Sequence, residues 1–135
     1  MAISISNFNS QLLAYIGATT AITDIVVTRY YNSRLPQNSL YPALVFSIIT
    51  NTDGAPTKDN LVNYDIVRVQ FDAFSNTPDD AVTLIDALRT KFTGFTDQDE
   101  TVLFHETFFK GAQQLQQDFD TKTYWQTIDF DFHIK

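Results

Sequence analysis

Residues 68–92 read RVQFDAFSNTPDDAVTLIDALRTKF and join a strand pattern directly to a helix pattern. Before the junction, apolar residues such as Val69 and Phe71 occur at every second position, which predicts a strand with one buried face. After the junction, Thr77 is a good N-cap residue and Pro78 suits the first helical position. The stretch therefore predicts a sheet and a helix that pack around one core.

The helix after the junction has charges that suit its dipole. Asp79 and Asp80 lie in its first turn, Arg89 and Lys91 lie in its last turn, and a glycine follows. A helix N-terminus can bind phosphate, but here a proline removes one donor and two acids occupy the positive end. We interpret the junction as a capped helix and not as an anion site. The predicted buried stripe is Ala81, Leu84, Ile85, Leu88 and Phe92.

The rest of the chain alternates between apolar patterns and turn residues. The predicted elements are a helix at 6–17, a short helical turn at 19–25, the helix at 78–92, and strands at 25–31, 43–50, 62–74, 101–110 and 124–134. Residues 111–123 fit either a Gln-rich loop or the continuation of a strand. Consecutive strands favour antiparallel pairing. We predict a single α+β domain over 1–135, with a four- or five-stranded, mainly antiparallel sheet and two helices packed on one face.

Composition and charge limit the possible functions. The chain has 135 residues, a formal net charge of −7 and no cysteine. Disulfides, thiolate metal sites and cysteine nucleophiles are therefore excluded. The acidic balance argues against a module that grips duplex DNA and against binding to anionic membranes, but it is compatible with DNA sliding past. The first ten residues have no signal-peptide pattern, so we expect no secretion signal.

Catalytic and metal-binding patterns are weak. Asp129, Asp131 and His133 share one face of a predicted strand and could contribute ligands to a divalent cation, but a solvated outer face is the favoured interpretation. Residues 96–100, TDQDE, lack the length and the central glycine of a calcium loop. No phosphate-binding glycine loop or nucleophile signature occurs. We expect no catalytic residue, no cofactor and no metal.

Aromatic and mixed polar side chains on the outer side of the sheet indicate a protein interface, because aromatic and arginine residues commonly anchor interfaces. The predicted interface residues are Arg68, Gln70, Phe74, Trp125 and Phe95. Some of these aromatic side chains could instead complete the core.

Three segments of the sequence resemble the tail completion, or tail terminator, proteins of long-tailed bacteriophages. They are RLPQNSLYPALVFSIIT (34–50), VRVQFDAFSNTPDDAVTLIDALRTKF (67–92) and QQDFDTKTYWQTIDFDFHIK (116–135). The resemblance implies a small α+β subunit with no enzymatic role. By the same resemblance, six such subunits would form a ring that caps the tail tube and faces the head–tail connector or neck protein. DNA would pass through this ring without sequence-specific binding. The protein would be assembled in the host cytoplasm and located in the tail or neck of the virion.

A ring subunit needs loops that reach its neighbours and the lumen. The candidate loops are 51–60, 93–100 and 111–122, in which acids outnumber bases. The predicted lumen or ring-contact residues are Asp53, Lys58, Asp59, Asp97, Asp99, Glu100, Asp118 and Asp120.

Two alternative functions stay open at the level of sequence. The chain could be another ring of the same machine, namely a head-completion neck protein or the tail tube subunit. It could also be a small cytoplasmic hydrolase or ligand-binding domain, which would require a deep pocket with convergent polar groups.

Overall fold

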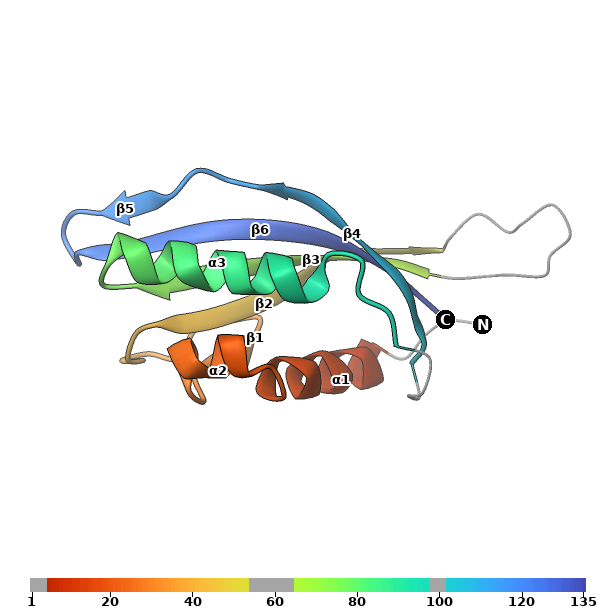
Figure 1. Ribbon diagram of the computed structural model, residues 1–135. Helices are drawn as coiled ribbons and strands as arrows, with labels where there is room; N and C mark the ends of the chain where they lie inside the picture. Colours follow the sequence, from red (N-terminus) through yellow and green to blue (C-terminus); the bar gives the residue numbers. More distant parts are fainter. Residues whose placement is uncertain (1–4, 54–64, 98–101) are drawn as a thin grey trace, which may run out of the picture.

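The computed structural model describes residues 5–53, 65–97 and 102–135. In chain order, the elements are α1 (Ile5–Gly17), α2 (Thr20–Val26), β1 (Tyr30–Asn32), β2 (Ala43–Asp53), β3 (Asp65–Ser75), α3 (Pro78–Phe92), β4 (Phe104–Ala112), β5 (Gln116–Asp118) and β6 (Thr123–Ile134). Figure 1 shows the three helices together in front of a long, curved sheet. Within these ranges, no helix has both the length and the apolar character that a bilayer span requires.

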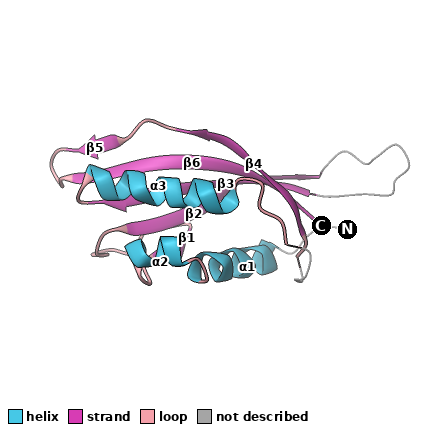
Figure 2. Cartoon of the chain, in the orientation of Figure 1, coloured by secondary structure: helices cyan, strands magenta, loops and turns pink. Residues whose placement is uncertain are grey.

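The strands form one sheet in the order β1-β2-β3-β6-β4, and β5 pairs with part of β6. Every pairing is antiparallel except the short parallel pair of β1 and β2. The helices cover one face, and none of the helices in the described ranges lies on the other face (Figure 2). The predicted α+β class is confirmed. The described residues form six strands and three helices rather than the four or five strands and two helices expected, because α2, β1 and β5 are too short to give strong patterns.

The junction at residues 68–92 folds as its sequence predicts. In β3, burial alternates strictly along the strand, with the predicted apolar residues on the buried face. The Thr77 side chain accepts a hydrogen bond from the backbone N–H of Asp80 at 3.4 Å, and Pro78 opens α3. All five residues of the predicted stripe on α3 are buried. The strand and the helix therefore bury their apolar sides against each other.

The core between the helices and the sheet is rich in phenylalanine. From α3, Phe92 stacks on Phe71 of β3 with ring centroids 5.5 Å apart. From α1, Phe8 stacks on Phe104 of β4 at 5.4 Å. Aromatic contacts thus connect both long helices to the sheet. The fully buried phenylalanines are Phe8, Phe46, Phe71, Phe92, Phe104, Phe130 and Phe132.

The predicted strand at 25–31 is wrong over most of its length. Ile25 and Val26 belong to α2, and only residues 30–32 form strand. Within α2, Ile22 and Val26 are buried one helical turn apart, so the core selects the helix over the β-branched preference of these residues.

Two further boundaries differ from those expected. Residues 51–53, predicted as loop, extend β2 and pair with β3. Residues 111–123 include β5, which pairs with β6 and forms a hairpin at the end of the sheet. Both extensions place polar residues in strands, because the neighbouring strand satisfies their backbone hydrogen bonds.

Candidate assembly interface

The side of the sheet without helices is a continuous surface, which we call the open face. On β3 and β6 it consists of the residues that alternate with the buried ones. Cross-strand register aligns these residues in rows, so that Arg68 lies opposite Asp131, Gln70 opposite Asp129, Asp72 opposite Thr127, and Phe74 opposite Trp125. On β2, Val45 lies opposite Asp72 and Ser47 opposite Gln70.

The structure brings four of the five predicted interface residues onto the open face. Phe74 and Trp125 are direct cross-strand neighbours at one end of it, and both are half-buried. Arg68 and Gln70 lie further along β3 on the same face. The open face therefore combines an aromatic pair with a charged and polar region, as protein interfaces commonly do.

The fifth predicted residue, Phe95, lies elsewhere. It follows α3, and its ring makes edge contacts with Tyr15 at 4.9 Å, with Phe92 at 5.5 Å and with Phe104 at 5.7 Å. Phe95 therefore packs at the margin of the core on the helix side, and we do not include it in the open face.

Charges on the open face are arranged in pairs across the strands. Arg68 lies 3.7 Å from the Asp129 carboxylate, and Lys110 of β4 lies 3.9 Å from Asp131. Both cations are well exposed, so these ion pairs stabilise the fold only weakly. They set an alternating pattern of charge that a partner surface would have to match.

Thr127 lies on the open face by its register opposite Asp72, but it is not exposed. It is buried, and its hydroxyl donates a 2.6 Å hydrogen bond to Oδ1 of Asp72. Gln70 also donates to the Asp72 carboxylate, at 3.3 Å. Val45, on the same face, is only 4% exposed. The middle of the open face is therefore closely packed, although no helix covers it.

Asp129 lies in this packed region. Burial raises the pKa of its carboxyl above the ordinary value, and the Arg68 guanidinium opposes this effect. The carboxylates of Asp72 and Asp131 raise the pKa further. Oδ1 of Asp129 is buried and has no hydrogen-bond partner among the described residues. Asp129 thus takes up a proton more readily than an ordinary aspartate does.

The suggested metal set of Asp129, Asp131 and His133 does not form a site. Burial lowers the pKa of His133, and its ring lies against Phe108 with centroids 4.8 Å apart. In the part of the chain that the structure describes, no three His, Asp or Glu side chains are placed to hold a metal ion.

The predicted lumen or ring-contact residues lie in different parts of the molecule. Asp97 is half-buried, and its Oδ2 accepts a 2.8 Å hydrogen bond from the Tyr15 hydroxyl, so it anchors the segment after α3 to α1. Asp118 and Asp120 lie at the turn between β5 and β6. Asp53 ends β2. The remaining candidates, Lys58, Asp59, Asp99 and Glu100, lie outside the described residues.

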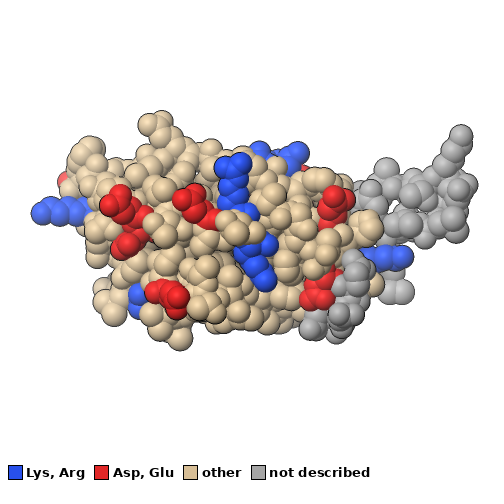
Figure 3. Space-filling view, viewed as in Figure 1, with Lys and Arg blue, Asp and Glu red and all other residues tan. Residues whose placement is uncertain are grey.

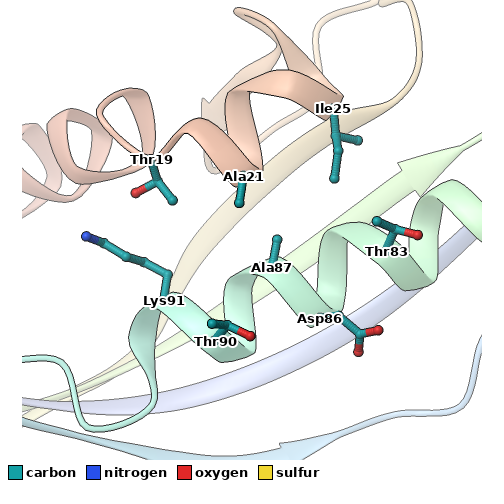
Figure 4. A pocket seen from close by; sticks show the side chains of 8 residues that line it. All are labelled: Thr19, Ala21, Ile25, Thr83, Asp86, Ala87, Thr90 and Lys91. Atoms are coloured by element: carbon teal, nitrogen blue, oxygen red, sulfur yellow. The ribbon is translucent and has the colours of Figure 1, made fainter.

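Two surface features were not predicted from sequence. One is a groove of about 540 Å³ between α2 and α3, lined mainly by small and aliphatic side chains (Figure 4). The other is Phe119, which is 79% exposed at the β5–β6 turn. Neither could be recognised from periodicity, since both depend on how distant elements are placed. The lining of the groove includes one acid, Asp86, and one base, Lys91.

Comparison with solved structures identifies the architecture. Twenty-two chains match the structure. One belongs to a structure described as "Virion of native gene transfer agent (GTA) particle", with a TM-score of 0.71 over 97% of this chain and 98% of that chain. The present fold is similar to that of a virion chain. At 11% sequence identity, the likeness is one of fold. No family model and no curated protein matches the sequence.

Proposed function

We propose that this chain is a structural virion subunit that forms a ring, caps a phage tail tube and joins it to the head connector, with DNA passing through the lumen. The observation that carries the proposal is the fold match to a chain of a gene transfer agent virion, which extends over nearly the whole of both chains. The resemblance of residues 34–134 to tail terminator proteins points to the same class of role.

The surface of the molecule is compatible with this role. The open face offers Phe74 and Trp125 as apolar anchors, and Arg68 and Gln70 as polar contacts beside them. We assign this face to contact with a neighbouring virion protein, either a second copy, the tube or the connector. The net charge of −7 suits a channel that does not retain DNA, because a negative wall repels phosphates.

The test is to delete the gene for this chain from the element that encodes it and to image the resulting particles by electron microscopy. Overlong tails, or tails without heads, would support a terminator that ends tube growth and joins the head. Normal virions would overturn the proposal. Re-expression of the wild-type chain should restore normal particles and is the control.

A second candidate, a neck ring or the tail tube subunit, is favoured equally by the fold match. Copy number separates the terminator from the tube subunit, since a terminator occurs as one ring per tail and a tube protein occurs as many. Position within the particle, seen by electron microscopy, separates the terminator from a neck ring. Quantitative mass spectrometry of purified particles, with the amount of this chain measured against that of the head connector protein, would give the copy number. Six copies per particle would fit the ring that we propose.

A further inference from the structure

Phe119 is an exposed aromatic side chain in a hydrogen-bonded turn. It lies in the turn between β5 and β6, and 79% of its surface is exposed. The turn is held by Asp118, whose Oδ1 accepts a 3.0 Å hydrogen bond from the backbone N–H of Asp120. Below the turn, β5 and β6 pair from Gln116 to Asp118. The hairpin lies at one end of the sheet (Figure 1). It presents a large apolar ring between two acids in the sequence.

The groove between α2 and α3 has complementary properties. Ala21 and Ile25 of α2 face Ala87 of α3 across it (Figure 4). Because most of the lining side chains are small, they leave the space between the two helices unfilled. Lys91 extends from α3 at the end of the groove where Thr19 lies, and its Nζ lies 5.0 Å from the centroid of the Phe95 ring (Figure 4). Asp86 also lines the groove but points away from α2 (Figure 4). The groove is therefore apolar inside and positively charged at the end where Lys91 lies.

The helix-covered surface around the groove carries charges of both signs (Figure 3). Acidic and basic side chains are scattered over this surface, with uncharged areas between them (Figure 3). An acid-flanked aromatic ring matches a groove that has mainly apolar walls and Lys91 at one end, with the Asp86 carboxylate pointing away from α2. Phe119 does not fill the groove of its own chain, since most of its surface is exposed.

We propose that the β5–β6 turn of one copy docks into the α2–α3 groove of the next copy, with Phe119 against Ala21, Ile25 and Ala87. Asp118 and Asp120 would then lie near Lys91. This proposal rests on the proposed function, since it supplies a contact that repeats around the ring. The turn and the groove are different surfaces, so the contact is head-to-tail, which is the geometry that closes rings.

The chain has no cysteine, so introduced thiols can report this contact directly. The test variant combines D120C, beside the ring, with T90C, at the groove, and leaves Phe119 in place. A short bis-maleimide is applied to the purified protein and, in parallel, to purified particles. Head-to-tail docking should give a ladder of dimers, trimers and higher species on a denaturing gel.

Three controls make the result specific. The pair D120C and V82C keeps both thiols but moves one to an exposed position on α3 that does not line the groove, so it should give several-fold less ladder. Each single-cysteine variant should give no ladder above the dimer. Adding F119S to the D120C and T90C pair should remove most of the ladder, because it removes the apolar anchor.

The outcomes separate this inference from the proposed function. No ladder in either sample, with both thiols reactive to a fluorescent maleimide, overturns the docking contact and leaves the virion role to be judged by the deletion experiment. A ladder that persists with F119S, or is equal with V82C, also overturns it. A ladder in purified protein, together with normal virions after deletion, would support the contact and reject the tail-capping role.

Discussion

The hydroxyl of Thr127 donates a 2.6 Å hydrogen bond to Oδ1 of Asp72, and this bond joins β6 to β3 across the open face. The two residues are 55 positions apart in sequence but directly opposite in the sheet. Thr127 is 6% exposed, so the bond is shielded from water on a face that no helix covers. The hydrogen bond to Asp72 explains why Thr127 is buried although it lies on the open face.

The first prediction concerns this bond. T127V keeps the shape of the side chain but removes the donor, and it should lower the free energy of unfolding by about 1–2 kcal/mol. Urea denaturation followed by circular dichroism measures the change. T127S, which keeps the hydroxyl, is the control and should retain more of the stability than T127V. A larger loss in T127S than in T127V would show that the methyl group, and not the hydrogen bond, is responsible.

The second prediction concerns the link between α1 and the segment after α3. Y15F removes the hydroxyl that donates to Asp97 at 2.8 Å, and should cost about 1 kcal/mol of unfolding free energy. Y124F, whose hydroxyl makes an exposed contact with Gln117, is the control and should change stability less. A smaller effect of Y15F than of Y124F would contradict the anchoring role.

This anchor also bears on the suggested lumen role of the 93–100 loop. Replacing Asp97 with lysine would break an internal hydrogen bond as well as change the charge. Charge reversal limited to Asp99 and Glu100 is the cleaner test. Unchanged DNA delivery by such particles would argue against a lumen role for these two acids.

The third prediction concerns the aromatic core. Phe92 stacks on Phe71 and meets Phe130 and Phe132 edge-on, with centroids 6.0 and 5.7 Å away. F92A should cost about 3–5 kcal/mol, which is a large part of the stability of a small domain. F119A, at an exposed position, should change monomer stability by less than about 0.5 kcal/mol. Thermal and urea unfolding give both values, and similar losses would contradict the assigned core.

The fourth prediction concerns pH. Burial raises the pKa of Asp129 above 3.8 in the folded chain, so the folded state binds the proton more readily than the unfolded state. The stability that this proton contributes is present below the unfolded pKa and is lost as pH rises through the folded pKa. D129N mimics the protonated form, so its stability relative to wild type should rise from pH 4 to pH 7 by less than about 1 kcal/mol.

Urea denaturation of both proteins across this pH range tests the sign, with D86N, at an exposed position on α3, as the control. A relative loss of stability for D129N at pH 7 would mean that the ion pair with Arg68 outweighs the cost of burial. His133 contributes in the opposite direction, because its lowered pKa makes stability fall as pH drops below about 6.5. The comparison is therefore made between D129N and wild type, in which His133 is the same.

The fifth prediction concerns the open face. W125A removes the larger member of the aromatic pair and should weaken assembly, or incorporation into particles, by about tenfold or more. Circular dichroism of the monomer confirms that the variant is folded, and light scattering or particle immunoblots measure assembly. V82A, on the opposite side of the molecule, should assemble normally. Normal assembly of W125A would exclude Trp125 as an anchor.

The sequence predicted the elements whose patterns are long and locally consistent. The β3–α3 junction was correct down to its cap and its buried stripe, because alternation, capping and charge all agree there. The C-terminal strand was recognised for the same reason. Residues 25–31 were not, because a short β-branched segment can be helix or strand, and burial of Val26 against the core decides.

For the predicted interface too, local sequence pattern predicted some residues correctly and tertiary contacts decided the others. Alternation along β3 places Arg68, Gln70 and Phe74 on the side of the strand that faces away from the core. The structure pairs β3 with β6, so that Trp125 joins them on one face. Phe95 could not be assigned in this way, since its aromatic partners come from α1, α3 and β4. The α2–α3 groove also has no sequence signature, because its walls come from helices more than fifty residues apart.

By itself, the sequence determined the α+β class, the core of the β3–α3 unit and the outward rows of the sheet, since side-chain period is a local property of the backbone. Only the tertiary structure decided which outward residues meet, that Thr127 is buried against Asp72, and that α2 and α3 leave a groove. The reason is that contacts between distant segments depend on the register and packing of elements whose local patterns do not refer to one another.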